Sequence, residues 1–313
     1  YAICAVLAAV AIFSSCNSQS KITMTTEDVK LDIYLAGSGT ATVDWGDGKE
    51  TLALSEEEKK ISHTYSPPPG NHIITITGAN ITAFSCYGDK LTSLDVSRNT
   101  ALTKLHCDGN KLTTLDVSKN TALTDLACGG NKLTTLDVSK NTALTELNCD
   151  GNKLTTLDVS KNTALTDLNC CKNQLTALDV SKNTALTMLG FGGNKLTVVD
   201  ISKNMAITKL WSYDNPLTTL DVSKHTALTS LACYGNQLTA LDVSKNTALT
   251  LLYCYDNQLS VEALNALFGT LHGNTIQGKS KDIYIYDNPG TKGCNRSIFE
   301  AKGWKLKNSS DRW

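Results

Sequence analysis

Apolar residues recur at a fixed spacing over most of the chain, from about residue 81 to residue 290. One unit of 21 residues starts at Leu123 and runs through Leu126, Ala127 and Cys128 to a Gly-Gly-Asn sequence. Because side chains alternate between the two faces of a strand, Leu126 and Cys128 are predicted to point inward and Ala127 outward. Repetition of the unit predicts stacked coils, each contributing one short strand that pairs in parallel with its neighbours. The inward cysteine column comprises Cys86, Cys107, Cys128, Cys149, Cys170, Cys233 and Cys254, with Phe191 and Ser212 in its two gaps.

Two asparagine columns follow the same period. An asparagine side chain carries donors and an acceptor, so it can satisfy the backbone groups that a turn leaves inside a coil. The second half of each unit, such as Leu136-Asp137-Val138, alternates again and predicts a short strand or a tight turn on the outer side. The first column comprises Asn110, Asn131, Asn152, Asn173, Asn194, Asn215, Asn236 and Asn257, with Asp89 one period earlier. The second column comprises Asn99, Asn120, Asn141, Asn162, Asn183, Asn204 and Asn246, interrupted by His225.

The pattern L-x-x-L-x-C-x-x-N-x-L resembles the leucine-rich repeat, with cysteine in place of its third leucine. The match covers roughly residues 81–290, and the short unit is similar to that of bacterial, internalin-like repeats. The resemblance implies a mainly β solenoid, with parallel strands on the concave face and short strands or turns on the convex face. It also implies adhesion or host interaction, although a fold by itself does not establish a function.

Residues 21–80 predict a separate β module, because short runs rich in Thr, Ile and Val alternate with turn sequences. Asp44-Trp45-Gly46-Asp47-Gly48, followed by His63-Thr64-Tyr65, Gly70 and the run Ile73 to Thr77, resembles a PKD domain. That resemblance implies a small immunoglobulin-like β-sandwich that serves as a spacer or adhesion module. Trp45 is interpreted as a core residue rather than a ligand platform.

Residues 1–20 indicate export. The apolar run from Ala2 to Phe13 is too short to span a bilayer, which needs about 20 residues, and is typical of a secretion signal. Ser14-Ser15-Cys16 resembles the lipobox of bacterial lipoproteins, which implies lipidation of Cys16 and an outer-membrane or cell-surface lipoprotein. A plain signal peptide with an incidental cysteine, giving a periplasmic or secreted protein, is the alternative.

The period breaks near the C-terminal end. Val261 to Leu271 has helical spacing, with Ser260 as the predicted N-cap and Glu262 in the first turn. Ile283 to Asn288 repeats the strand-plus-asparagine pattern, so one last coil is predicted to carry a helix. Residues 291–313, which include Trp304, are predicted to form a C-terminal cap.

Composition and charge exclude several classes of protein. The 313 residues include 29 Lys plus Arg and 30 Asp plus Glu, which argues against a nucleic-acid partner attracted by bulk positive charge. Neither a catalytic set nor a cofactor motif is evident, and membrane contact is expected only through the lipid anchor. One cysteine per coil predicts core packing rather than a metal site, since metal ligands occur as closely spaced pairs. Cys171 is predicted to point outward as a free thiol or crosslinking site, with chance substitution as the alternative.

Two further groups of polar residues have simple interpretations. The columns that contain Asp137 and Lys140 place one acidic and one basic residue in every coil, which predicts a solvated face with compensating charges. His106, Cys107 and Asp108 are adjacent in sequence, but Cys107 is predicted to point inward, which disfavours a catalytic trio.

The outward positions on either side of the cysteine column are free to vary. At the C-terminal end of the repeats they carry seven aromatic residues, which offer large contact area at low entropy cost to a protein or glycan. Stacked rings that only stabilise the sheet are the alternative. The predicted binding residues are Trp211, Tyr213, Tyr234, Tyr253, Tyr255, Tyr284 and Tyr286. An acidic stretch lies upstream and comprises Asp108, Asp125, Glu146, Asp150 and Asp167.

These features predict a non-enzymatic binding or adhesion protein of the bacterial envelope or surface. Its concave face would recognise a protein or glycan through the aromatic residues, and the module at residues 21–80 would hold the solenoid away from the membrane. The alternative is a structural spacer or scaffold without a concave-face ligand.

Overall fold

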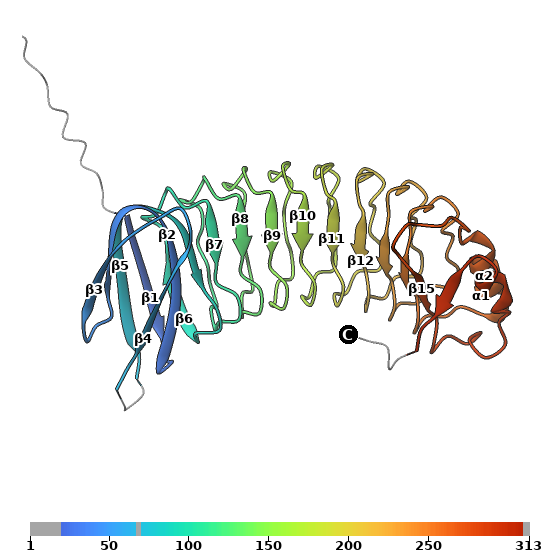
Figure 1. Ribbon diagram of the computed structural model, residues 1–313, viewed down its shortest axis with the longest axis horizontal. Helices are drawn as coiled ribbons and strands as arrows, with labels where there is room; N and C mark the ends of the chain where they lie inside the picture. Colours follow the sequence, from blue (N-terminus) through green and yellow to red (C-terminus); the bar gives the residue numbers. More distant parts are fainter. Residues whose placement is uncertain (1–19, 67–69, 309–313) are drawn as a thin grey trace, which may run out of the picture.

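The structure is a computed structural model, and it describes residues 20–66 and 70–308. Figure 1 shows a curved row of coils with a β module at the N-terminal end and two short helices at the C-terminal end. Cys16 and the rest of the predicted signal segment at 1–19 lie outside the described residues, as do residues 309–313 of the predicted cap.

The solenoid has about eleven turns, because eleven strands pair side by side in parallel. Leu126 is opposite Leu147, and Leu147 is opposite Leu168, so residues one period apart lie in register. The predicted mainly β solenoid is therefore confirmed. Its strands are β5 (His72–Cys86), β7 (Lys104–His106), β8 (Asp125–Ala127), β9 (Glu146–Asn148), β10 (Asp167–Asn169), β11 (Met188–Gly190), β12 (Lys209–Trp211), β13 (Ser230–Ala232), β14 (Leu251–Tyr253), β15 (Lys281–Tyr284) and β16 (Trp304–Leu306).

The first asparagine column links successive coils through their backbones. The Nδ2 of Asn131 donates to the carbonyl of Cys107 in the preceding coil at 2.9 Å and to that of Cys128 in its own coil at 3.1 Å. Its Oδ1 accepts from the amide of Leu112 at 3.0 Å. The predicted role of these side chains is thereby confirmed: each satisfies polar groups that would otherwise be buried without partners.

The convex side of the repeats consists of turns. The second asparagine column stabilises them, with Nδ2 of Asn141 donating to the carbonyls of Val117 at 3.0 Å and Asn120 at 2.8 Å. Asp137 accepts from the amide of Ser139 at 2.8 Å, and the same contact recurs along its column. No ion pair joins the aspartates and lysines of these two columns in the described part of the chain. Hydrogen bonds from Ser139 and then the charge of nearby Lys140 lower the pKa of Asp137, so each aspartate fixes a turn and the lysine column also compensates its charge, as predicted.

The N-terminal module shares its backbone with the solenoid. Strand β5 pairs in its first half with β1 and in its second half with β7, so it passes through the predicted boundary at residue 80 without a break. All six strands, β5 included, are hydrogen-bonded into the sheet that continues along the solenoid. The other five are β1 (Ser20–Thr26), β2 (Lys30–Asp44), β3 (Lys49–Ala53), β4 (Lys59–Thr64) and β6 (Leu91–Asp95).

Trp45 lies in the core of the N-terminal module, as predicted, with 2% of its surface exposed. Its ring stacks on His63 at 4.7 Å, and its carbonyl accepts from the hydroxyl of Tyr65 at 3.1 Å. Burial raises the pKa of Tyr65 to about 12, so this hydroxyl stays protonated and can donate. The assignment of the module to the immunoglobulin-like sandwiches stays a prediction.

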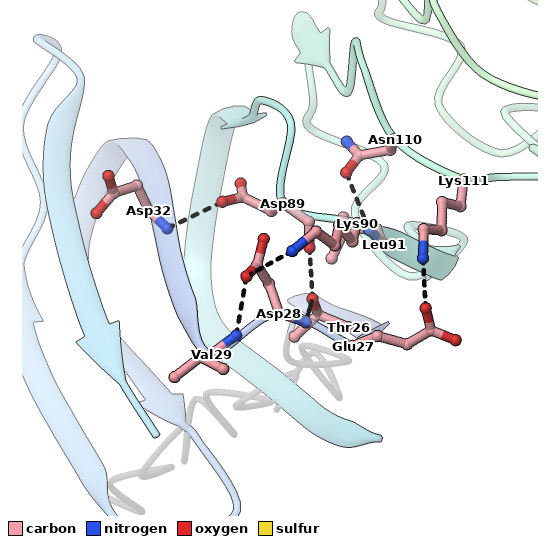
Figure 2. Close-up of polar contacts among 10 residues, drawn as sticks. All are labelled: Thr26, Glu27, Asp28, Val29, Asp32, Asp89, Lys90, Leu91, Asn110 and Lys111. Carbon is pink, nitrogen blue, oxygen red and sulfur yellow. Dashed lines mark hydrogen bonds and ion pairs between the residues drawn. The ribbon is translucent and has the colours of Figure 1, made fainter. Parts of the chain in front are cut away.

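The junction between the module and the first coil contains a group of acidic residues (Figure 2). Asp89 occupies the place that asparagine has in later coils, and its Oδ1 accepts from the amide of Asp32 at 3.3 Å. Its other oxygen is buried and has no hydrogen-bond partner among the described residues. Burial raises the pKa of Asp89 to about 6, because the charged form loses hydration. Beside it, Lys90 pairs with Asp28 at 3.1 Å.

A helix-containing coil and a last strand close the C-terminal end. Helix α1 (Val261–Thr270) begins at Ser260, whose side chain accepts from the amide of Ala263, as the capping pattern predicted. Asn288 donates to the carbonyl of Cys254 at 3.0 Å, which places the last asparagine in the same column. Helix α2 (Ser297–Glu300) follows, and Trp304 at the start of β16 is buried.

Candidate binding groove on the concave face

Each strand of the solenoid presents its middle residue to the core and its two flanking residues to the concave side. In β12 to β15 the residues Trp211, Ala232, Tyr253 and Tyr284 lie in register, one per strand. A second column, here called the tyrosine column, lies two residues further along the chain in each coil. It consists of Tyr213, Tyr234, Tyr255 and Tyr286. The structure thus places all seven predicted aromatic residues on one face, in two adjacent columns.

The tyrosine column forms a continuous stack. Ring centroids are 4.9 Å apart for Tyr213 and Tyr234, 4.4 Å for Tyr234 and Tyr255, and 4.1 Å for Tyr255 and Tyr286. Tyr253 and Tyr284 stack in the same way at 4.4 Å. These separations follow from the strand spacing of about 4.8 Å, which is close to the distance that parallel rings prefer.

Stacking covers part of the predicted binding surface. Tyr255 retains only 9% exposure and Tyr284 only 5%, because each is covered by neighbouring rings. The expectation that all seven rings face solvent is therefore wrong for these two. The other five are half-buried, so one part of each ring remains accessible.

Two glycines create the space that the first rings of these columns occupy. A Cβ at residue 192 would lie 2.5 Å from Cε1 of Tyr213, and a Cβ at residue 190 would lie 3.1 Å from Cε3 of Trp211. Both rings therefore lean over the strand that precedes their own. Only the packing shows that Gly190 and Gly192 accommodate the two rings.

Cys171 does not present an open thiol. It lies in the tyrosine column, one strand before Gly192, and only 2% of its surface is exposed. Burial raises its pKa to about 11, which keeps the sulfur protonated at neutral pH. Cys171 is a free cysteine, as predicted, but its burial contradicts the expected exposure and disfavours crosslinking, because the thiolate is the reactive form.

Between Trp211 and Tyr253 the aromatic column is interrupted by Ala232, and a groove opens there. Its volume is about 510 Å³, and its lining is mostly apolar. Ala232 forms the floor, since its side chain ends at Cβ while both register neighbours carry large rings. The rings are evident from the sequence, whereas the gap between them becomes apparent only when the strands are paired. The lining residues are Lys209, Trp211, Tyr213, Ser230, Ala232, Tyr234, Leu251, Tyr253 and Tyr255.

Negative charge lies on the same face, toward the N-terminal end of the solenoid. Glu146 begins β9 and Asp167 begins β10, in register with each other. Asp150 lies beside them in the column that later carries the tyrosines. Within residues 20–66 and 70–308, no ion pair neutralises these three carboxylates. The acidic stretch and the aromatic columns thus form adjoining parts of one surface.

His106 contacts residues of neighbouring strands rather than its sequence neighbours. Its Nδ1 is 2.8 Å from the Tyr87 hydroxyl and its Nε2 is 2.8 Å from Asp125. Cys107 points into the core, as predicted, so the three adjacent residues do not converge. Across the described ranges, no group of three His, Cys, Asp or Glu side chains is arranged to hold a metal ion.

The cysteine column is part of the core. Cys107, Cys128 and Cys149 are fully buried, and burial raises the pKa of each thiol well above its usual range. The sulfur atoms therefore act as small apolar groups between coils, as the two-residue spacing to the leucines predicted. Ser212 fits the same column by donating to the carbonyl of Ala232 at 3.2 Å.

Comparison with solved structures agrees with this architecture. The chain is similar to the functional domain of InlJ from Listeria monocytogenes, whose structure includes a cysteine ladder. The two share 41% identity with a TM-score of 0.64, over 74% of this chain and 50% of that chain. The fold is a leucine-rich repeat solenoid with an internalin-like structural neighbour.

More distant structures share the fold alone. A leucine-rich repeat protein of Leptospira interrogans is 23% identical with a TM-score of 0.58, over 68% of this chain and 56% of that chain. The ectodomain of a plant receptor kinase from Arabidopsis thaliana is 20% identical with a TM-score of 0.54, over 68% of this chain and 27% of that chain. The chain spans about half the length of the first two of these solved proteins.

Two other comparisons add little. Residues 189–215 match the LVIVD repeat family, which covers one coil and part of the next. A search of curated proteins finds no match.

In the described residues, no helix is both long enough and apolar enough to cross a bilayer.

Proposed function

We propose that this chain is a non-enzymatic surface protein that binds a protein or glycan partner in the concave groove. The observation that carries the proposal is the gap at Ala232. An aromatic column that served only to stabilise the sheet would be expected to continue through this position. Instead, alanine leaves one side of Trp211 and one side of Tyr253 open to a groove with an apolar floor. Such rigid rings are typical recognition groups.

A structural role for the rings has its own support. The four-ring stack from Tyr213 to Tyr286 leaves Tyr255 almost covered, which is typical of a ladder that stabilises its own sheet. A spacer without a concave-face ligand is therefore the second candidate. The two candidates differ in what they require of Trp211, whose ring borders the groove and does not belong to the stack.

The experiment is a binding screen of the full chain against arrays of surface proteins and glycans, repeated with Ala232→Tyr. The added ring would fill the gap without removing any existing side chain, so the fold should persist and binding should be lost. Ala127→Tyr, in the same column five strands earlier, is the matched control. A partner that binds Ala232→Tyr as well as the parent chain would assign recognition to another surface. Absence of any partner for the folded chain in both arrays would favour the spacer.

We also propose how the protein is held at the cell envelope. Cys16 would carry a lipid, and the β module, as a PKD-like spacer, would place the solenoid away from the outer membrane. Support comes from the order of the segments along the chain, with the β module between Cys16 and the solenoid. Mass spectrometry of the protein's native N-terminus tests this proposal. A mature chain that begins elsewhere than at a lipid-modified Cys16 would overturn it.

A further inference from the structure

The strand spacing leaves room for one ring at the gap above Ala232. Trp211 and Tyr253 lie on strands two apart, so their backbones are about 10 Å from each other. A flat group between two rings needs about 3.5–4.0 Å on each side, or about 7–8 Å together. Trp211 leans toward Gly190, on the side away from Ala232. One planar or nearly planar ring therefore fits between the two walls.

The far wall of the slot is rigid. Tyr253 stacks on Tyr284, so the side of its ring that faces Ala232 is held in a fixed orientation. A prearranged wall loses little entropy when a ligand ring enters. Lys209 and Ser230, the first residues of β12 and β13, border the opening of the slot. Their side chains supply hydrogen-bond donors for a polar group attached to the ligand ring.

The surroundings of the slot define the charge of the partner. Three and four strands toward the N-terminal end lie Asp167 and Glu146, about 14 and 19 Å from the slot. Asp150 adds a third carboxylate beside Glu146, and it too has no ion pair in the described part of the chain. Between the slot and these carboxylates lie two strands: β12, whose exposed Lys209 borders the slot, and β11, which contributes the uncharged residues Met188 and Gly190. An elongated ligand along the solenoid would therefore meet a ring slot at one end and negative charge at the other.

We infer that the partner is a protein segment with an aromatic side chain for the slot and basic side chains about 14–19 Å away for the acidic residues. This inference rests on the proposed function of the groove and adds the chemistry of its ligand. In an extended segment, at about 3.3 Å per residue, the two features are about four to six residues apart. The segment lies along the solenoid axis, across the strands.

Electrostatics favours a protein over a glycan here. Neutral sugars could donate hydroxyl hydrogen bonds to Glu146, Asp150 and Asp167 but carry no positive charge to pair with them, and acidic polysaccharides would be repelled. Arginine and lysine side chains are the groups that pair with carboxylates. An aromatic ring and a cation on one flexible chain satisfy both parts of the surface at once, which a single sugar ring in the slot does not.

The test uses synthetic peptides and the full chain. The probe is a labelled peptide with one Trp, a Gly-Ser spacer of three residues and three Arg, so that the arginines lie four to six residues from the Trp. Its controls replace Trp by Ala, replace Arg by Glu, or shorten the spacer to one residue. A neutral oligosaccharide array is probed in parallel. Affinities are measured by fluorescence anisotropy at low salt and again at about physiological ionic strength, where charge contacts further apart than about 8 Å are screened.

Three variants of the chain separate the parts of the site. Ala232→Tyr fills the slot, and Glu146→Lys with Asp167→Lys reverses the charge of the acidic strands. The control for charge is Glu50→Lys with Glu56→Lys, which makes the same change of net charge at exposed residues of the N-terminal module. Circular dichroism and melting curves verify that each variant is folded.

The inference predicts about a tenfold loss of peptide affinity for Ala232→Tyr and for the Glu146/Asp167 pair, each equal to about 1.4 kcal/mol. The Glu50/Glu56 control should bind as the parent chain does, and each altered peptide should bind more weakly than the probe. Equal affinity after reversal of Glu146 and Asp167, with loss in Ala232→Tyr, would overturn the basic partner and leave the groove function intact. A neutral oligosaccharide that binds in the slot would do the same. If no probe binds more weakly to Ala232→Tyr than to the parent chain, both the basic aromatic partner and the groove function are overturned.

Discussion

The ring of Tyr213 lies directly over Gly192, where a Cβ would come within 2.5 Å of the ring carbon Cε1. Because residue 192 has no side chain, the tyrosine stack can start at Tyr213. The Tyr213 ring in turn covers the thiol of Cys171. Residue 192 does not need the left-handed backbone conformation that favours glycine, so alanine can replace it without backbone strain. The space above residue 192 is therefore what requires glycine.

Gly192→Ala is expected to displace the Tyr213 ring and to uncover Cys171. The thiol should then ionise more readily, because the burial that raises its pKa to about 11 is relieved. Peptide mapping after brief alkylation of the native protein measures the modification at Cys171. Gly273→Ala, where no atom lies near the added carbon, is the control. An unchanged rate at Cys171 would show that Tyr213 does not protect it.

Asp89→Asn is expected to stabilise the protein at neutral pH and to have no effect near pH 4. The carboxyl has a pKa of about 6 when folded, against about 3.8 when unfolded, so its ionisation opposes folding as the pH rises through this window. The shift of about two units corresponds to about 3 kcal/mol above pH 6. Denaturant melts at pH 4, 6 and 8 measure the difference. The reciprocal change, Asn110→Asp, should destabilise the next coil with the same pH dependence.

The two asparagine columns are expected to differ in their contribution to stability. Asn152 uses both ends of its amide, accepting from Leu133 and donating to Cys128 and Cys149. Asn162 donates twice, but within residues 20–66 and 70–308 its Oδ1 has no hydrogen-bond partner. Fewer buried groups lose a partner in Asn162→Ala than in Asn152→Ala. Asn162→Ala should therefore lower the free energy of unfolding by about 1–2 kcal/mol, and Asn152→Ala by about 2–4 kcal/mol. Equal losses in urea melts would contradict this ranking.

Cys149→Ser is expected to be nearly tolerated, although it places a hydroxyl in the core. Ser212 occupies the same column and donates to the carbonyl of the next coil at 3.2 Å, and a serine at 149 can do the same toward Asn169. Destabilisation should stay below about 1 kcal/mol, since the buried hydroxyl is hydrogen-bonded. Cys149→Asn, which adds volume and an extra polar group, should be far less stable. Thermal melts of the two variants decide between packing and hydrogen bonding as the limiting factor.

Much of the fold could be predicted because the repeat is strict. A fixed period forces equivalent residues into register, so Leu126, Cys128 and Asn131 could be assigned to core and turn from their spacing alone. The caps were harder, since they occur once each. Ser260 carried a local signal that identified the start of α1, whereas the continuous path of β5 from the module into the solenoid had no sequence signal at residue 80.

The sequence by itself determined which face each repeated side chain occupies, because a strand alternates its side chains and the period repeats the alternation in every coil. Only the tertiary structure decided which of those side chains remain accessible. Tyr255 is covered by its stacked neighbours and Cys171 is buried in the same column, while the small side chain of Ala232 opens a groove beside Trp211. Accessibility depends on the volumes of residues one and two coils away, and these adjoin only after the chain has wound.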